Sequence, residues 1–424
     1  MWINLISLML CLCAIGVFLR KGNYLSFIIT GIFCILHVGQ AIYIRSEVLP
    51  ADYDGAARML DNEFNQDGLF RAEIWIFVVS LAFLVFSITS SGIHNGAVSF
   101  IRPRKGRKSP GFIMAIMSAA IILFSFIYLI SLVGGLDNYL FLGRPMSPGM
   151  TVPICLLIVP IYLTIYLSGA GFRVGHVQLL LCFISILIAF SLSRIVGFSY
   201  FLTLMLSPMS PVKINRVRFI SAISLLFVVF LAWGAYREFI SQDSDSEKLT
   251  NAMTFAHNYQ FGIEATSGLA AAMSSPLVEG HDLGISLMST PLAIIPAQLR
   301  GDEGQRLLEG IRDQFANSTF SIVPSGMECF YIHFGEFGLL IYIALCIFMM
   351  RLGTTAVFFP KEAFPTRYYV VTPCVIASAP FFVRGSTLVA LNLVITWYIV
   401  SWLCYFIVRL MKQEYNAEIP PINK

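Results

Sequence analysis

The chain contains little charge, because aspartate, glutamate, lysine and arginine make up only 12% of its 424 residues. Soluble globular domains carry roughly 25% charged residues, so the composition does not fit a soluble protein. The chain is instead 57% hydrophobic, with a mean hydropathy of +0.77 in long apolar runs. These features are typical of an integral membrane protein. The formal net charge of +4 is spread among loops, so nucleic acid is not an expected partner.

Cysteine motifs typical of metal or redox sites are also missing. The nine cysteines include no Cys-x-x-Cys pair and no Cys/His spacing of a zinc site. All except Cys329 lie in apolar runs, where they fit as small buried side chains. We therefore expect no disulfide framework, no metal and no cofactor. The first apolar run has no charged n-region and no small-residue cleavage site, so we expect it to be retained.

Eleven apolar segments are long enough to be read as membrane helices. They are 2–19, 24–44, 72–92, 112–133, 151–167, 177–192, 195–210, 219–236, 330–350, 368–383 and 387–408. The sequence therefore predicts an all-α polytopic integral membrane protein with about eleven transmembrane helices, within a range of ten to twelve. Segments 177–192 and 195–210 fit either two short helices that meet at Ser193-Arg194 or one long helix with a break.

Basic residues predict the orientation of these helices, because cytoplasmic links carry an excess of lysine and arginine. The cluster Arg102, Arg104, Lys105, Arg107 and Lys108 is therefore assigned to the cytoplasm. Alternation then places 17 basic residues in cytoplasmic links and 11 on the other side, where the links are much longer. We expect an external N-terminus and a cytoplasmic C-terminus.

The hydrophilic block 237–329 is the largest polar segment, and the same alternation places it outside the membrane. It divides the chain into helices 1–8 in residues 1–236, the external block itself, and helices 9–11 with a cytoplasmic tail in residues 330–424. The apolar stretch 283–297 contains Pro291 and Pro296 and is too short to span, which favours an element in the outer interface. Residues Glu303 to Ala316 have the spacing of a short amphipathic helix.

Two titratable residues stand where the block runs into the ninth segment. Glu328 and His333 lie at the predicted membrane edge, where an ionisable group is costly unless it is paired or used. Either one is a candidate to take a proton from an attacking hydroxyl. Simpler explanations are an interfacial histidine bonded to a neighbour and a structural carboxylate.

Four arginines fall at the external ends of predicted helices or interface elements: Arg194, Arg237, Arg300 and Arg384. A single arginine at this depth commonly extends to lipid phosphate. Four on one face favour a binding site, because guanidinium groups bind phosphate through paired hydrogen bonds and keep their charge. A lipid-linked sugar donor presents a diphosphate at this face, and arginines would stabilise that diphosphate as it leaves.

The layout and several short motifs resemble the bacterial O-antigen and oligosaccharide repeat-unit polymerases. Ser191-Leu-Ser-Arg194 is similar to a small-residue–arginine turn of that family, and Pro291 to Arg300 resembles its proline-containing interface stretch. Gly326-Met-Glu328, followed by Phe334-Gly335-x-x-Gly338, is similar to its Gly-x-Glu…Phe-Gly-x-x-Gly ending. The arginine-x10-glycine pattern of some members is not matched after Arg237 or Arg300, which weakens a role for Arg237.

The resemblance implies a glycosyltransferase of the bacterial inner membrane that polymerises undecaprenyl-diphosphate-linked repeat units at the periplasmic face, for O-antigen or another surface polysaccharide. The lipid-linked glycan would be both donor and acceptor, and a chain-length regulator is a candidate partner. Arg194, Arg300 and Arg384 would bind diphosphate, with Arg237 a weaker candidate. Glu328 would act as the base or position the acceptor.

Three other functions remain open. An O-antigen ligase resembles this layout, but ligases favour a histidine well before the Gly-x-x-Gly pair, whereas His333 directly precedes it. A metal-dependent glycosyltransferase that uses polyprenyl-phosphate sugars would need acidic residues such as Asp52-Tyr-Asp54, which also fit a solvated acidic loop. A lipid-linked-sugar flippase usually has internal repeats, and none is recognisable.

Overall fold

A computed structural model describes residues 1–45, 66–90, 111–135, 151–207, 209–212, 215–240, 264–274, 325–358, 366–384 and 387–417. These residues form helices and no strands, which confirms the predicted all-α class for the described part of the chain. Internal contacts divide the chain into two compact units. Unit 1 consists of Met1–His94, Ala256–Thr355 and Ser378–Ile395, and unit 2 of Asn95–Phe255, Ala356–Ala377 and Thr396–Lys424.

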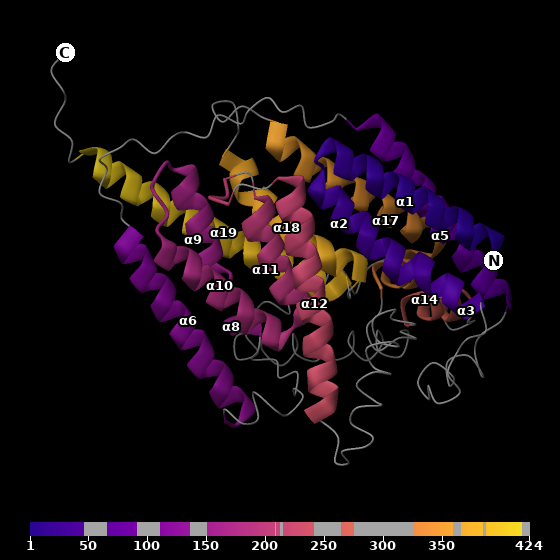
Figure 1. Ribbon diagram of the computed structural model, residues 1–424, viewed down its shortest axis with the longest axis horizontal. Coiled ribbons are helices and arrows are strands. Elements are labelled where there is room, and N and C mark those ends of the chain that lie inside the picture. The colour runs from indigo at the N-terminus through magenta and orange to yellow at the C-terminus, as the bar shows by residue number, and fades with distance from the viewer. Residues whose placement is uncertain are drawn as a thin grey trace, which may run out of the picture. The chain divides into compact units, whose positions relative to one another are not determined.

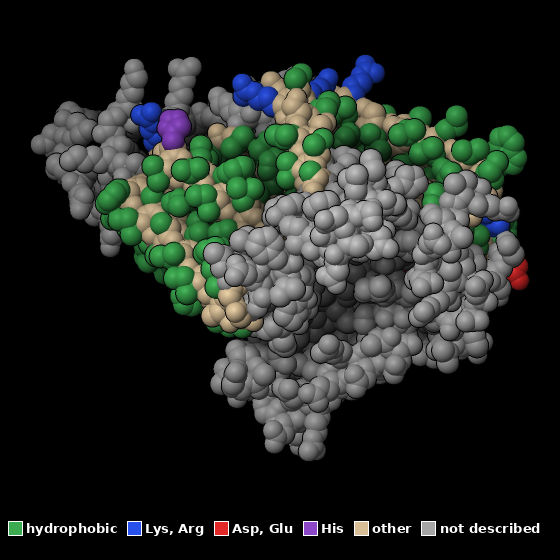
Figure 2. Space-filling view, turned by 60° about the horizontal axis from the view of Figure 1, so that its bottom comes forward, with side chains coloured by type: hydrophobic (Ala, Val, Ile, Leu, Met, Phe, Trp, Pro, Cys, Tyr) green, Lys and Arg blue, Asp and Glu red, His purple; other side chains and the backbone are tan. Residues whose placement is uncertain are grey.

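Among the described residues, seven helices are long and apolar enough to cross a membrane. They are Trp2–Lys21, Tyr24–Arg45, Asp67–Thr89, Gly111–Leu132, Val152–Gly169, Gly326–Gly353 and Leu393–Gln413. Apolar helices at His176–Leu192, Arg194–Leu206 and Val370–Arg384 are shorter. Hydrophobic side chains dominate the described surface in Figure 2, as expected for helices that face lipid. Every predicted segment contains helical residues, whereas the count of eleven spans stays a prediction.

Unit 1 is built around a group of packed helices near the N-terminus. It contains α1 (Trp2–Lys21), α2 (Tyr24–Phe33), the π-helix η1 (Cys34–Gly39), α3 (Gln40–Arg45), α5 (Gln66–Thr89), α14 (Glu264–Ser274) and most of α17 (Gly326–Phe358). Helices α2, η1 and α3 follow one another without a break. Helix α1 packs along α5 and α2, and α14 packs against α5 and η1 (Figure 1).

Polar contacts at both ends of α1 and α5 show that the two helices run parallel. Asn4 donates a hydrogen bond to Glu73 Oε1 at 2.8 Å near their starts. At their other ends, Lys21 Nζ donates to the carbonyls of Ser87 and Ser90 at 2.7 and 2.5 Å. The positive lysine thereby satisfies carbonyls at the negative end of α5. Parallel helices fit the predicted alternation, while the side that faces the cytoplasm stays a prediction.

Unit 2 contains α6 (Gly111–Val133), α8 (Thr151–Leu157), α9 (Val159–Gly169), α10 (His176–Leu192), α11 (Arg194–Leu206) and α12 (Arg216–Ile240). Ser193 separates α10 from α11 in an extended conformation, with φ −147° and ψ 118°. A Cβ atom on Gly197 would lie 2.5 Å from Phe190 Cα. Segments 177–192 and 195–210 are therefore two short helices that fold back on each other, rather than one long helix.

A break between α8 and α9 creates the polar centre of unit 2. Pro160 has no backbone N–H and prevents a continuous helix. The Gln178 side chain donates to Ser118 Oγ at 2.9 Å, to Thr164 Oγ1 at 3.0 Å and to the Pro160 carbonyl at 3.3 Å. Cys182 Sγ also lies 3.4 Å from that carbonyl. Neutral side chains thus gather around the break at Pro160.

Two further helices cross the boundary between the units. They are α18 (Thr366–Arg384) and α19 (Thr387–Ala417). Within unit 2, the Tyr166 hydroxyl shares a hydrogen bond with Ser401 of α19, which in turn donates to the Val370 carbonyl of α18 at 3.1 Å. These contacts tie the unit 2 parts of both helices to α9.

Candidate functional site

Helix α14 comes from the large hydrophilic block, and side chains of neighbouring helices hold both of its ends. The Thr266 N–H near its start donates to Gln40 Oε1 at 2.7 Å, and the Thr266 hydroxyl donates to the His37 carbonyl at 3.0 Å. At its other end, Arg71 Nη1 donates to the Met273 carbonyl at 3.1 Å. Because the ends of a helix lack partners within it, these contacts fix α14 in unit 1.

Glycines allow α14 to approach its neighbours closely on two sides. A Cβ atom on Gly68 of α5 would overlap Ser274 Oγ and lie 2.5 Å from the Ala270 carbonyl oxygen. A Cβ atom on Gly268 would lie 2.6 Å from Glu328 Oε2 of α17. The middle of α14 therefore lies directly on the carboxylate of Glu328.

Glu328 is completely buried in the first turn of α17. Its Oε2 accepts a hydrogen bond from the Ser325 N–H at 3.3 Å, and the Glu328 N–H donates to Ser325 Oγ at 3.2 Å. This reciprocal pair is a capping box, in which two backbone donors at a helix start are satisfied together. The sequence suggested Glu328 as a proton acceptor, and the structure shows that the same carboxylate also caps α17.

Gly335 breaks α17 into a short helix before it and a longer helix after it. It has φ 61° and ψ −146°, a conformation that side chains other than glycine rarely adopt. A Cβ atom on Gly338 would overlap the Phe330 carbonyl oxygen, and the rings of Phe330 and Tyr342 lie 6.1 Å apart. The short helix thus folds back along the longer one. The predicted close approach at the Gly-x-x-Gly pair occurs within α17.

Seven consecutive residues of the short helix are buried: Met327, Glu328, Cys329, Phe330, Tyr331, Ile332 and His333. Other parts of the protein therefore surround these side chains. His333 is 2% exposed, and its ring lies 6.3 Å from that of Phe334. Glu328 and His333 are five residues apart, or about 140° around a helix. They therefore lie on different faces of the short helix.

A more exposed ionic contact joins α5 to α17 beside this buried helix. Arg71 Nη2 donates to Glu336 Oε1 at 2.8 Å and to the Tyr331 hydroxyl at 3.3 Å. The Arg71 side chain is 43% exposed and that of Glu336 is 55% exposed. With the Met273 carbonyl as its third acceptor, Arg71 is positioned by α14 and by both parts of α17.

A second ion pair lies deeper among the first helices. Arg45 Nε contacts Glu73 Oε1 at 2.7 Å, and Glu73 is 2% exposed. The same oxygen accepts the bond from Asn4. Three helix ends meet at this carboxylate, so its pairing holds together the part of unit 1 on which α14 rests.

The predicted arginines belong to different parts of the chain. Arg384 is the last residue of α18 in unit 1. The end of α18 lies against the start of α17. A Cβ atom on Gly326 of α17 would overlap the carbonyl oxygen of Phe382, two residues before Arg384. Arg194 is the first residue of α11, in unit 2. The convergence of Arg194 with Arg384 stays a prediction.

Other predictions about the hydrophilic block fall outside the described residues. These are Arg300, the stretch 283–297 and the amphipathic helix Glu303 to Ala316. The acidic loop with Asp52-Tyr-Asp54 also lies outside them. Arg237 belongs to α12, but its side chain is not among those described.

Comparisons with protein-family models, with curated proteins and with solved structures found no match. Within the described residues, no three histidine, cysteine, aspartate or glutamate side chains are placed to share a metal ion. The function is therefore inferred from the geometry of unit 1 and from the motifs in the sequence.

Sequence reasoning did not single out Arg71, Glu73, Glu336 or α14. The available signal was Arg71-x-Glu73, two opposite charges directly before an apolar run. Their partners are distant along the chain, since Arg71 and Glu336 are separated by 265 residues. Helix α14 is short and rich in alanine, serine and glycine, so its sequence carries little signal before its neighbours are known.

Proposed function

We propose that this protein polymerises undecaprenyl-diphosphate-linked oligosaccharide repeat units at the periplasmic face of the bacterial inner membrane. The observation that supports the proposal most is the buried carboxylate of Glu328, set under α14 beside the end of α18 that carries Arg384. The proposal combines a candidate base and a candidate anion-binding residue in one unit. It also agrees with the motifs around Arg194 and Gly335.

The proposed reaction transfers the growing glycan to a newly arrived repeat unit. A hydroxyl oxygen of the acceptor sugar forms a bond to the anomeric carbon of the donor, and the bond from that carbon to the diphosphate oxygen breaks. The hydroxyl proton passes to the Glu328 carboxylate, which acts as the general base. The electron pair leaves with undecaprenyl diphosphate, whose charge Arg384 and the other external arginines would stabilise.

Deletion of the gene, followed by electrophoresis of the surface glycan, tests the proposal. Long chains are expected to collapse to the lipid core with a single repeat unit, and the wild-type gene should restore them. Persistence of long chains would show that the protein is not the polymerase. Extraction of the lipid carrier separates the ligase alternative, because loss of a ligase leaves long polymer attached to undecaprenyl diphosphate.

The arginines are tested in the same deletion strain. Arg194→Ala and Arg384→Ala are each expected to abolish long chains at normal protein abundance. Arg409→Ala is the matched control, because Arg409 is exposed near the end of α19 and lies on the predicted cytoplasmic side. Normal ladders from both Arg194→Ala and Arg384→Ala would refute the proposed diphosphate contacts.

A further inference from the structure

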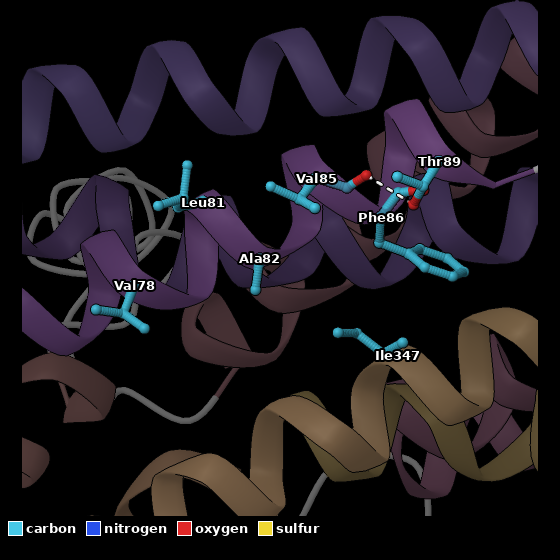
Figure 3. A pocket seen from close by; sticks show the side chains of 7 residues that line it. All are labelled: Val78, Leu81, Ala82, Val85, Phe86, Thr89 and Ile347. Atoms are coloured by element: carbon cyan, nitrogen blue, oxygen red, sulfur yellow. Dashed lines mark hydrogen bonds between the residues drawn. The ribbon is translucent and has the colours of Figure 1, made fainter.

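An apolar groove of 460 Å³ runs between α5 and α17 in unit 1. Figure 3 shows the side chains that line it, one of them from α17 and the rest from α5: Val78, Leu81, Ala82, Val85, Phe86, Thr89 and Ile347. From Val78 to Thr89 it follows about 16 Å of α5, at 1.5 Å per residue. The groove therefore has the length and the apolar lining that suit a hydrocarbon chain lying along the helices.

The ionic contact between Arg71 and Glu336 joins the same two helices. Val78 is seven residues after Arg71 and Val85 is fourteen after it, so both lie within about 40° of Arg71 around α5. On α17, Ile347 is eleven residues after Glu336, or about 20° away around the helix. The ion pair and the groove thus occupy the same faces of α5 and α17, with the charged groups at one end.

We propose that α5 and α17 bind an anionic isoprenoid lipid, with its phosphate or diphosphate on Arg71 and its hydrocarbon chain in the groove. The proposal rests on the proposed function, for which it names the residues that hold the lipid carrier. It commits to a membrane lipid rather than a free anion, because the apolar groove begins at Val78, about 10 Å further along the same face of α5 than Arg71. Glu336 occupies the position of the lipid phosphate when no lipid is bound.

Arg71 is suited to such an exchange because its ion pair is exposed while its other contacts are not. Exposed ion pairs contribute little to stability, so an incoming anion displaces Glu336 at small cost. The Met273 carbonyl and the Tyr331 hydroxyl continue to orient the guanidinium. A phosphate group presents more charge and more acceptor oxygens than a carboxylate, and arginine binds it through two parallel hydrogen bonds.

The head group and the chain make different contributions to binding. Lipid tails are as apolar as the groove, so moving a chain from the bilayer into it gains no hydrophobic free energy. Arg71 therefore supplies the larger part of the affinity, and van der Waals packing of a chain that fits the groove supplies the rest. The two parts can be tested separately.

Binding is measured by native mass spectrometry of the purified full chain in detergent, with undecaprenyl diphosphate as the probe. Arg71→Gln is expected to weaken binding by roughly tenfold to a hundredfold, because bonds to a charged group are lost. Glu336→Gln is expected to tighten binding several-fold, since the competing carboxylate is gone. In the double variant the benefit of Glu336→Gln should disappear. Arg409→Gln is the control for loss of one exposed arginine.

Glu336→Gln separates this proposal from a purely structural ion pair. If the pair only holds α5 and α17 together, removing the carboxylate will weaken binding or leave it unchanged, and either outcome overturns the proposal. Equal binding of inorganic pyrophosphate and undecaprenyl diphosphate by the wild type would also overturn it, because the chain would then contribute nothing.

Ala82→Phe tests the groove, since the larger side chain would fill it. This variant is expected to lose the preference for undecaprenyl diphosphate over phosphatidic acid, which carries two acyl chains. Ala119→Phe is the matched control, because Ala119 is exposed on α6 in unit 2. An unchanged preference in a folded Ala82→Phe protein would show that ordinary bilayer lipid fills the groove. Folding is checked by thermal unfolding in the same detergent.

Failure of this proposal and failure of the proposed function give different results. If the protein makes polymer but lipid binding is unchanged in the Arg71 and Glu336 variants, the proposed function stands and this lipid site is refuted. A protein that binds the lipid through Arg71 but makes no polymer retains the site and loses the proposed reaction.

Discussion

The two units differ in the chemistry of the polar groups that they bury. In unit 1, charged side chains join the helices, as in the Arg45–Glu73 pair, and Glu328 is buried beneath α14. The contacts described in unit 2 join neutral groups, such as the Gln178 amide and the Thr164 hydroxyl. Burying a charged group costs much free energy unless the group is paired, whereas a hydrogen-bonded neutral group is buried at a smaller cost.

This difference suggests that the polar groups of unit 1 serve function and that those around Pro160 in unit 2 serve structure. The neutral contacts of unit 2 surround the break between α8 and α9 at Pro160. A structural role at this break explains why these polar groups are present. In unit 1, the Glu328 carboxylate lies next to Gly268 of α14, and Arg71 and Glu336 form a half-exposed ion pair beside it. Helix packing alone does not require these charged groups. Substitutions around Glu328 and Arg71 in unit 1 should therefore affect activity, whereas substitutions around Pro160 in unit 2 should affect stability.

The largest effect is expected from Glu328→Gln. Glutamine can take the same capping position as glutamate, so the midpoint of thermal unfolding should stay close to that of the wild type. The rate of polymerisation by the purified protein should fall by roughly a hundredfold or more, because a general base contributes about 10²–10⁴ in rate. A normal polymerisation rate would show that Glu328 only caps α17. The main functional difference between the two units would then be lost.

Gly68→Val should produce the largest loss of stability. Its side chain would push α14 away from α5, because a Cβ atom there already overlaps Ser274 Oγ. Overpacking of this kind lowers the free energy of unfolding by about 3 kcal/mol. Gly16→Val in α1 is the control, since no atom lies within 4 Å of its Cβ position. Equal effects of the two changes in urea unfolding would show that α14 is not held where the structure places it.

Gly335→Ala should have a smaller effect on stability. Alanine is strained at φ 61°, and such strain costs about 1–3 kcal/mol. Because the short helix carries Glu328, the polymerisation rate should fall together with the unfolding midpoint. A stable and fully active variant would mean that α17 does not need the break at this position.

The smallest effect is expected from Gln178→Leu in unit 2. The change removes the amide that bonds Ser118 and Thr164, at a cost of about 1 kcal/mol per lost hydrogen bond. The folded fraction should polymerise glycan at the wild-type rate per molecule, as measured after correction for unfolded protein. A reduced rate in the folded fraction would show that the contacts around Pro160 take part in the reaction, which would remove this difference between the two regions.

The sequence allowed the helices to be predicted better than the site. Apolar runs place membrane helices because hydropathy and length are local properties. At Ser193-Arg194 the sequence left open two short helices or one long helix with a break, and the structure has two helices. The partners of Arg71 lie 202 and 265 positions away, and Gly268 lies 60 positions before Glu328. A single sequence does not reveal such distant contacts. Glu328 was identified from a local motif, whereas its capping role depends on the conformation of Ser325.

The π-helix η1 has a consequence for how this arrangement could arise. A π-turn contains about one residue more than an α-helical turn, so η1 is equivalent to a single insertion in the second membrane helix. Deleting one residue between Cys34 and Gly39 would rotate everything after it by about 100°. Gln40 Oε1 would then move away from the Thr266 N–H, from which it now accepts a hydrogen bond. One codon is thus enough to create or remove the contact between Gln40 and the start of α14, the helix that covers Glu328.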